Sequence, residues 1–390
     1  MLVTLCVTET TSWGVLYYAF PVLASRIGED TGWSLTRLSA AFSFALLVSA
    51  VVGIAVGRRL DRHGPRWLMA VGSALAAAAL AGVALAPSFG WFVCSWAVAG
   101  VAMSAVLYPP AFAALTRWYG DRRVHALTVL TLAAGLASTI FAPLTAALAA
   151  GLGWRTTYLV LAALLAVVTV PAHVLGLRRP WPALALAPRA GVAHAPRTVV
   201  RSRAFICLVA AFALTSLTAY VVVVNLVPLL AERGFSAGTA ALVLGVGGIG
   251  QVVGRVGYAP LVRRLSVRTR TAAVLGTVAL STALLGVLTW LPALVAVAVL
   301  AGMVRGISTL LQATAVTDRW GPRDYGVLSS VVAAPSTITI AVAPVVGAGL
   351  AALLGGYASM LVCMAVIGVA AAALSLGSLP VPPRPAAVEQ

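Results

Sequence analysis

The sequence contains few charged residues, and very few of those are acidic. Of its 390 residues 9% are charged, and only nine are Asp or Glu. Soluble domains contain roughly a quarter charged residues, so the composition excludes an ordinary soluble globular domain. Lysine is absent, and all 26 basic residues are arginine. Because the phosphate-binding loop of P-loop ATPases needs a lysine, the sequence also argues against a pump driven by that loop.

Residues that could build a catalytic or metal centre are scarce and scattered. Each of the four cysteines lies in an apolar segment without a close partner, and the four histidines lie far apart in the sequence. This pattern is typical of small buried residues and predicts neither a disulfide nor a metal site. We therefore expect no enzyme, no metal and no cofactor.

Long apolar segments fill most of the chain. The composition is 61% hydrophobic, with a mean hydropathy of +1.03. A helix of about 20 residues crosses a hydrocarbon core of ~30 Å, and the segments lack the alternation of a membrane barrel. Backbone groups in lipid must be paired within the span. The sequence predicts an all-α integral membrane protein with twelve transmembrane helices, at 2–25, 37–57, 67–86, 91–115, 124–150, 156–177, 204–230, 237–261, 271–290, 292–316, 326–352 and 357–379.

The arginines are distributed very unequally between the two sides of these spans. One side has only four arginines, which are Arg26, Arg37, Arg155 and Arg233. The other side has 21, which lie in 58–66, 117–123, 178–203, 255–270 and 319–323 and at Arg384. Loops rich in arginine remain in the cytoplasm. We expect a multi-pass protein of the bacterial plasma membrane with both termini cytoplasmic. This asymmetry accounts for the net charge of +17 without a nucleic-acid partner.

A polar segment at 178–203 divides the spans into two sets of six. The two sets resemble each other: "AGVAMSAVLYPPAFAALTRW" (99–118) matches "AGMVRGISTLLQATAVTDRW" (301–320). Since six is an even number, both sets begin on the same side of the membrane. We predict a six-helix bundle at 1–177, a cytoplasmic linker at 178–203, a second bundle at 204–379 and a cytoplasmic tail at 380–390.

The segment "GRRLDRHGPR" (57–66) resembles the loop between helices 2 and 3 of the major facilitator superfamily, G-x-x-x-D-R-x-G-x-R. The matching residues are Gly57, Asp61, Arg62, Gly64 and Arg66. The resemblance implies two pseudo-symmetric six-helix bundles that alternate access to a central site. It also implies that Asp61 contacts the start of helix 11, near Tyr325 and Gly326, and closes a cytoplasmic gate. In the second half Tyr258 replaces the aspartate, so we expect a one-sided contact.

Further segments resemble the bacterial relatives of monocarboxylate and oxalate:formate transporters. These are "GWSLTRLS" (32–39), "TRWYGDRRVHALTVLTLAAG" (116–135) and "GLGWR" (151–155). This branch usually has a cation in helix 8, where we find only Gln251. The same resemblance places Asp121 in the loop between helices 4 and 5, where we expect it to pair with Arg66.

Only Glu9 and Arg305 are charged near the middle of a span. Charges at that depth cost at least ~2.5 kcal/mol and therefore usually face a cavity or a partner. The family resemblance implies that helices 1, 4, 7 and 10 line the cavity, which places both residues on its wall. Helical spacing puts Trp13, Tyr17 and Phe20 on the face of Glu9, and Thr309 and Gln312 on the face of Arg305. Helix 4 adds Tyr108 before Pro109–Pro110, and helix 7 offers two polar faces, with Tyr220 on one and Asn225 on the other.

These residues predict a secondary active transporter that moves a small organic anion, similar to a monocarboxylate, together with protons. Arg305 would bind the anion and Glu9 would exchange the proton. The structural alternatives are a Glu9–Arg305 ion pair that only holds the halves together, or an Arg305 whose donors are satisfied by carbonyl groups. The alternative functions are proton-driven efflux of a drug-like compound or secondary metabolite, favoured by the aromatic residues, and a receptor or scaffold that transports nothing. We expect a monomer in the lipid bilayer whose partners are protons and a small-molecule substrate.

Overall fold

The computed structural model describes residues 1–182 and 196–380, and in these ranges it contains helices and no strand. Most of the expected linker and tail lie outside the described residues. The part of the linker that is described includes a short helix, α9 (Pro196–Arg201), and the next helix begins at Arg203, at the linker's expected end.

The first half is built from α1 (Leu2–Trp13), the π-helical turn η1 (Gly14–Tyr18), α2 (Ala19–Thr31), α3 (Leu35–His63), α4 (Pro65–Ala84), α5 (Phe89–Val106), α6 (Tyr108–Tyr119), the 3₁₀ turn η2 (Gly120–Arg122), α7 (Arg123–Gly135) and α8 (Ala137–Gly176). The second half contains α10 (Arg203–Glu232), α11 (Ala237–Arg264), α12 (Val267–Val287), α13 (Leu291–Ala315), α14 (Thr317–Trp320), α15 (Tyr325–Leu354) and α16 (Tyr357–Leu376).

These elements form the twelve membrane crossings expected from the sequence. Among the described residues, nine helices are long and apolar enough to cross a membrane. The longest of the nine, Phe89–Gly176, is a nearly continuous helical stretch that runs from α5 to α8 and contains three crossings. The chain turns at Gly120–Arg122 and again at Gly153, whose φ of 73° and ψ of 167° end the helical path inside α8. The segment Leu2–Thr31 adds one more crossing, which η1 divides.

The expected disturbance at Pro109–Pro110 is present. The helix α5 ends at Val106, Leu107 is extended with φ −94° and ψ −171°, and α6 begins at Tyr108 with both prolines in its first turn. Proline is tolerated in a first turn because the N–H that it lacks would have no intrahelical partner there. The break therefore precedes the prolines and turns Tyr108 toward the space between the halves.

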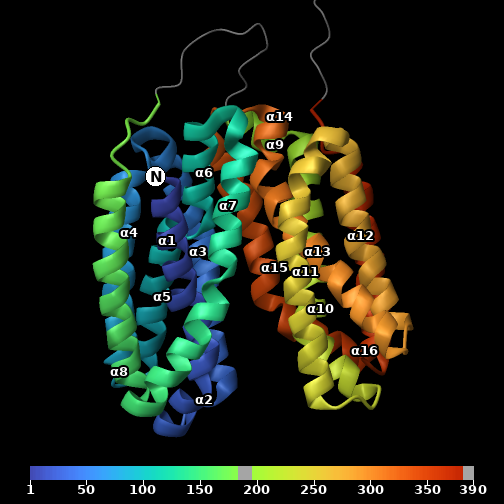
Figure 1. The fold of residues 1–390 in the computed structure, drawn as a ribbon, viewed down its shortest axis with the longest axis horizontal. Helices are drawn as coiled ribbons and strands as arrows, with labels where there is room; N and C mark the ends of the chain where they lie inside the picture. Colours follow the sequence, from blue (N-terminus) through green and yellow to red (C-terminus); the bar gives the residue numbers. More distant parts are fainter. Residues whose placement is uncertain (183–195, 381–390) are drawn as a thin grey trace, which may run out of the picture.

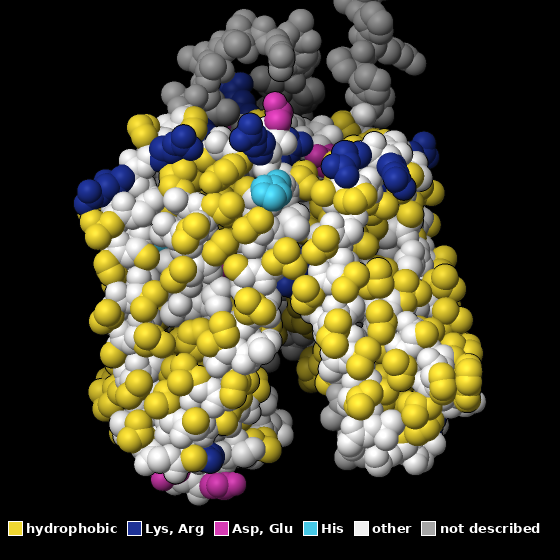
Figure 2. All heavy atoms as spheres, viewed as in Figure 1, with side chains coloured by type: hydrophobic (Ala, Val, Ile, Leu, Met, Phe, Trp, Pro, Cys, Tyr) yellow, Lys and Arg dark blue, Asp and Glu magenta, His cyan; other side chains and the backbone are white. Residues whose placement is uncertain are grey.

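The two halves stand side by side and meet at one end of the molecule (Figure 1). We call this the arginine-rich end, because Arg58, Arg62, Arg123 and Arg270 belong to it and basic side chains gather there (Figure 2). One apolar cluster joins the halves, with Leu60 and Leu130 from the first half and Leu311 and Leu328 from the second. At the opposite end a cleft separates the halves (Figure 2). The structure is therefore closed at the arginine-rich end and open at the other.

Candidate functional site

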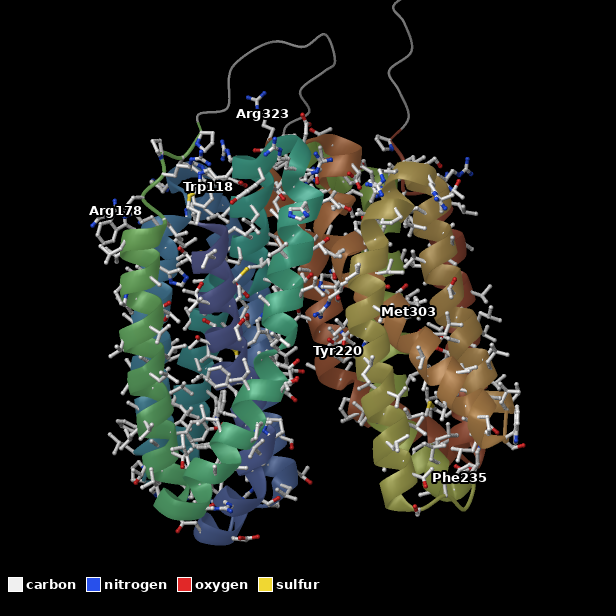
Figure 3. The ribbon with its side chains drawn as sticks, in the orientation of Figure 1. Trp118, Arg178, Tyr220, Phe235, Met303 and Arg323 are labelled. Atoms are coloured by element: carbon white, nitrogen blue, oxygen red, sulfur yellow. The ribbon has the colours of Figure 1, made fainter. Side chains whose placement is uncertain are left out.

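A cavity of about 400 Å³ lies between the two halves. Its wall includes seven of the ten residues that the sequence analysis places around the substrate site, which are Trp13, Tyr17, Tyr108, Tyr220, Arg305, Thr309 and Gln312. Tyr220 extends from α10 between the halves at mid-depth (Figure 3). The sequence analysis missed the polar side chains that α15 adds, Ser329, Ser336 and Thr337. Gln312 Nε2 donates a hydrogen bond to Ser336 Oγ over 3.3 Å, which joins α13 to α15 at the cavity wall.

Arg305 faces the cavity without a carboxylate partner. Its Nη2 donates a hydrogen bond to Gln251 Oε1 over 3.2 Å. No ion pair of Arg305 occurs within the described ranges, so the Glu9–Arg305 pair considered as a structural alternative is not formed. A guanidinium has five N–H donors in a planar fork suited to a carboxylate. One contact to a neutral amide leaves most of these donors available to a ligand.

Glu9 is fully buried and does not line the cavity, which corrects the sequence-based expectation. Its Oε2 accepts a hydrogen bond from Trp13 Nε1 over 3.1 Å, and its Oε1 has no hydrogen-bond partner among the residues that the structure describes. Trp13 does line the cavity, and its ring lies 4.9 Å from that of Tyr108 between centroids. The carboxyl group is therefore connected to the cavity through the indole of Trp13.

The π-helical turn changes which residues of helix 1 face the cavity. A π turn has one more residue than an α turn, so it rotates the residues that follow. Tyr18, which the sequence analysis missed, lines the cavity. Phe20, expected there, is buried and stacks on Phe42 at 4.6 Å between centroids. Gly14 begins the turn where the Phe141 ring of α8 leaves no room for a Cβ atom.

Asn225 also lies away from the cavity. It is buried, its Nδ2 donates to the Val221 carbonyl over 2.8 Å, and it packs against Gly347 of α15. The sequence offered two polar faces on helix 7, and only the face of Tyr220 borders the cavity. Asn225 therefore joins α10 to α15 within the second half.

Asp61 makes the expected contact with the start of helix 11. The segment expected to be a loop is helical as far as His63, and Gly64 breaks it with a φ of 74° before Pro65 begins α4. Asp61 Oδ1 accepts from the Gly326 N–H and Oδ2 from the Val327 N–H, both over 2.9 Å. These N–H groups lie in the first turn of α15, where they lack intrahelical partners and the helix dipole favours a negative charge.

Two glycines allow this close approach. A Cβ atom at Gly57 would overlap the Gly326 carbonyl oxygen, and one at Gly326 would lie 2.7 Å from Asp61 Oδ1. The contact therefore depends on backbone proximity between α3 and α15 as well as on the carboxylate.

The expected pair of Arg66 with Asp121 is not formed. Arg66 Nε donates to the Val174 carbonyl of α8 over 2.8 Å, and Asp121 is exposed. The charged contact between the halves is made instead by Arg123 and Asp318, over 3.2 Å, and Arg270 shares the same carboxylate. Arg62 is exposed at the end of α3.

Arg255 is a buried cation that the sequence analysis assigned to a loop. The helix α11 continues to Arg264, and Arg255 is only 5% exposed. Its Nη1 donates to the Thr131 carbonyl of α7 over 2.6 Å, beside Gly135, where a Cβ atom would overlap that nitrogen. The second half thus makes its own contact across the interface, which corrects the expected one-sided gate. Arg255 lies four residues after Gln251, which puts both side chains on one helical face. That spacing could have revealed the buried position of Arg255.

Sequence comparison identifies relatives of the chain. It is 29% identical to human monocarboxylate transporter 11 over 274 residues, which are 64% of this chain and 54% of that protein. It is 33% identical to an uncharacterized 38 kDa protein in the 23S RNA operon of Thermoproteus tenax, over 33% of this chain and 34% of that protein. The chain thus spans about half or less of the length of these curated relatives.

The fold is shared with solved structures. An E. coli fucose:proton symporter, FucP, superposes with a TM-score of 0.74 and 13% identity over 96% of this chain and 97% of that one. A FucP structure described as being in the outward conformation gives a TM-score of 0.76 with the same identity and coverage. The sequence profile of the Major Facilitator Superfamily matches residues 5–309. The chain is therefore a member of the Major Facilitator Superfamily.

Proposed function

We propose that this protein moves a small organic anion, of the monocarboxylate kind, together with protons. Membership of the Major Facilitator Superfamily makes it a membrane transporter and not an enzyme. Transport in such a fold proceeds by rocking of the two halves around a site near the middle of the membrane. The proposal concerns the substrate, the coupling ion and the residues that handle them.

Arg305 is the observation on which the substrate class rests. Its guanidinium lines the cavity, its one side-chain hydrogen bond within the described residues is to the neutral amide of Gln251, and hydroxyl groups of α13 and α15 line the same cavity. A cation in a low-dielectric cavity is costly unless a counter-charge is present. An anionic substrate supplies that charge, and a carboxylate matches the fork of the guanidinium. The similarity to a protein named as a monocarboxylate transporter supports the same class.

Glu9 is the proposed proton site. It is the one acidic side chain in the middle of a span, and within the described ranges its Oε1 has no hydrogen-bond partner. Trp13 transmits the state of Glu9 to the cavity, because the same indole bonds to the carboxyl group and packs against Tyr108. The proposed sequence of events is proton exchange at Glu9, adjustment of Trp13 and a change in anion affinity at Arg305.

The positive-inside rule assigns the arginine-rich end to the cytoplasm of a bacterial cell. On this assignment the cavity is open to the exterior, and Asp61 and Arg255 hold a cytoplasmic gate closed. Asp61 does so at the N-terminus of α15, where the helix dipole favours its charge, and Arg255 does so at the Thr131 carbonyl of α7. Both contacts must break before the substrate can leave toward the cytoplasm.

Efflux of a drug-like compound is the second candidate. The aromatic side chains of Trp13, Tyr17, Tyr18, Tyr108 and Tyr220 favour it, because they offer a large apolar surface to a hydrophobic ligand.

Purified protein in proteoliposomes with an imposed pH gradient distinguishes the two candidates. Labelled lactate, pyruvate, formate and oxalate are compared with a cationic dye, for the unmodified protein and for Arg305→Ala. Uptake of one of the carboxylates that is lost in Arg305→Ala supports the proposal. Dye movement that is unchanged by Arg305→Ala, with no carboxylate flux, supports efflux and overturns the anion assignment.

A further inference from the structure

A second, larger cavity lies at the arginine-rich end, separate from the substrate cavity. Its volume is about 940 Å³, and it is bounded by the end of α3, the short helix α9 and the start of α15. None of its lining residues also lines the substrate cavity. It therefore has no part in substrate binding as proposed above.

Four arginines dominate this cavity. Arg58 and Arg62 are one turn apart on α3, and Arg197 and Arg201 are one turn apart on α9. Residues four apart share a helical face, and two like charges in that arrangement repel each other and destabilise a helix. Within the described residues, none of the four forms an ion pair. Two repelling pairs thus border one space, and a bound anion would relieve the repulsion.

The two carboxylates in the wall do not neutralise these charges. Asp61 already accepts hydrogen bonds from two backbone N–H groups of α15, and Asp324 adds one negative charge against four positive charges. The wall retains an excess of positive charge. Phosphate groups, with several acceptor oxygens, are bound well by clusters of arginine.

The rest of the wall is apolar. Pro196, Val200, Val327 and Val331 complete it. Arginines at the rim of a membrane protein beside an apolar surface suit an amphiphile whose charged headgroup meets the arginines while its stem contacts the valines. Free phosphate would use only the arginines. The combination favours a lipid over a soluble ion.

We propose that this cavity binds the phosphate group of an anionic phospholipid. The bound headgroup would bridge α3 of the first half and α9, which leads into α10 of the second half, directly beside the contact of Asp61 with α15. A ligand that touches both halves at their closed end binds that state more tightly than one in which the halves separate. The lipid would therefore stabilise the closed arginine-rich end.

The test measures lipid binding directly and is independent of any transported substrate. Full-length protein in neutral detergent is titrated with phosphatidylglycerol, and bound lipid is counted by native mass spectrometry. The variant Arg197→Gln/Arg201→Gln removes two charges from the cavity. The matched control Arg263→Gln/Arg264→Gln removes two exposed charges at the end of α11, outside the cavity. Phosphatidylcholine and inorganic phosphate are titrated in parallel.

We expect one phosphatidylglycerol that binds the cavity variant at least about tenfold more weakly than the unmodified protein or the control. The conservative variant Arg197→Lys/Arg201→Lys should retain binding, which would separate loss of charge from misfolding. Equal affinity in the cavity variant and the control would overturn the proposal. Equal binding of phosphatidylcholine would also do so. Binding of inorganic phosphate without any binding of phosphatidylglycerol would overturn the lipid assignment in favour of a soluble anion.

Discussion

Asp61 of the first half accepts a hydrogen bond from the backbone N–H of Gly326 in the second half, over 2.9 Å. The partner is a backbone group, so the hydrogen bond is weakened most directly by a change of the carboxylate itself. The contact joins the halves where the apolar cluster around Leu60 and Leu328 also joins them.

Asp61→Asn should weaken closure of the arginine-rich end. The amide keeps one acceptor oxygen but loses the charge, and a hydrogen bond to a charged group exceeds a neutral one by roughly 1 to 2 kcal/mol. The open form should gain roughly five- to thirtyfold in population. Spin labels at Arg59→Cys and Arg323→Cys, in a protein without its native cysteines, report the change as a longer distance between labels. Asp121→Asn, an exposed carboxylate without an ion pair within the described residues, should leave the distance unchanged.

Gly57→Ala should open the same end by a steric route. Its Cβ atom would overlap the Gly326 carbonyl oxygen, so α3 and α15 must move apart. Gly53→Ala is a matched control on the same helix, since its Cβ atom would meet nothing nearer than Ser104 at 4.0 Å. The same spin-label pair should lengthen for Gly57→Ala and not for Gly53→Ala. Equal distances in the two variants would show that close packing does not contribute to closure.

Gly135→Ala should displace Arg255 from α7. The added methyl group would occupy the position of Arg255 Nη1 and remove its hydrogen bond to the Thr131 carbonyl. Spin labels at Arg122→Cys and Arg263→Cys should move apart, and Arg255→Gln should have the same effect. Gly245→Ala, on the same helix as Arg255 with open space around it, serves as the control. An unchanged distance in both Gly135→Ala and Arg255→Gln would contradict a gate role for Arg255.

Glu9→Gln should separate proton coupling from binding. The amide is similar in size and can still accept a hydrogen bond from Trp13, but it cannot exchange a proton. Accumulation driven by a pH gradient should be lost, while exchange of labelled for unlabelled substrate should persist. Trp13→Phe keeps the ring and removes the N–H, so it should weaken coupling without abolishing exchange. Accumulation that is unchanged in Glu9→Gln would exclude Glu9 as the proton site.

Hydropathy and the repeat were sufficient to predict the twelve helices and the two halves, because membrane spans are determined largely by their own composition. The family resemblance placed Asp61 opposite Gly326 correctly. Arg255 was missed because it was counted with the arginines of the cytoplasmic segment 255–270, although the expected span runs to 261 and the helix α11 continues to Arg264. A buried arginine is tolerated there because a carbonyl of another helix accepts its hydrogen bond.

The orientation of side chains on helix 1 could not be predicted from spacing. An ideal α-helix puts Glu9, Trp13 and Phe20 on one face, but the π turn at Gly14–Tyr18 rotates the later residues. The turn begins at Gly14, which lies against the ring of Phe141, a residue distant in the sequence. Asn225 was likewise assigned to the cavity because the sequence does not reveal that Gly347 lies against it.

The central claim is that the charge of Arg305 binds an anionic substrate, and exchange of labelled carboxylate tests it most directly. Proteoliposomes loaded with unlabelled substrate need no gradient, so the measurement does not depend on Glu9. We expect Arg305→Lys to retain measurable exchange with a raised half-saturation concentration, because the charge remains but the planar fork is lost. Arg305→Gln should abolish exchange. Arg233→Gln, at the end of the second half away from the arginine-rich end, should not. Exchange of similar affinity in Arg305→Gln and the unmodified protein would contradict the account.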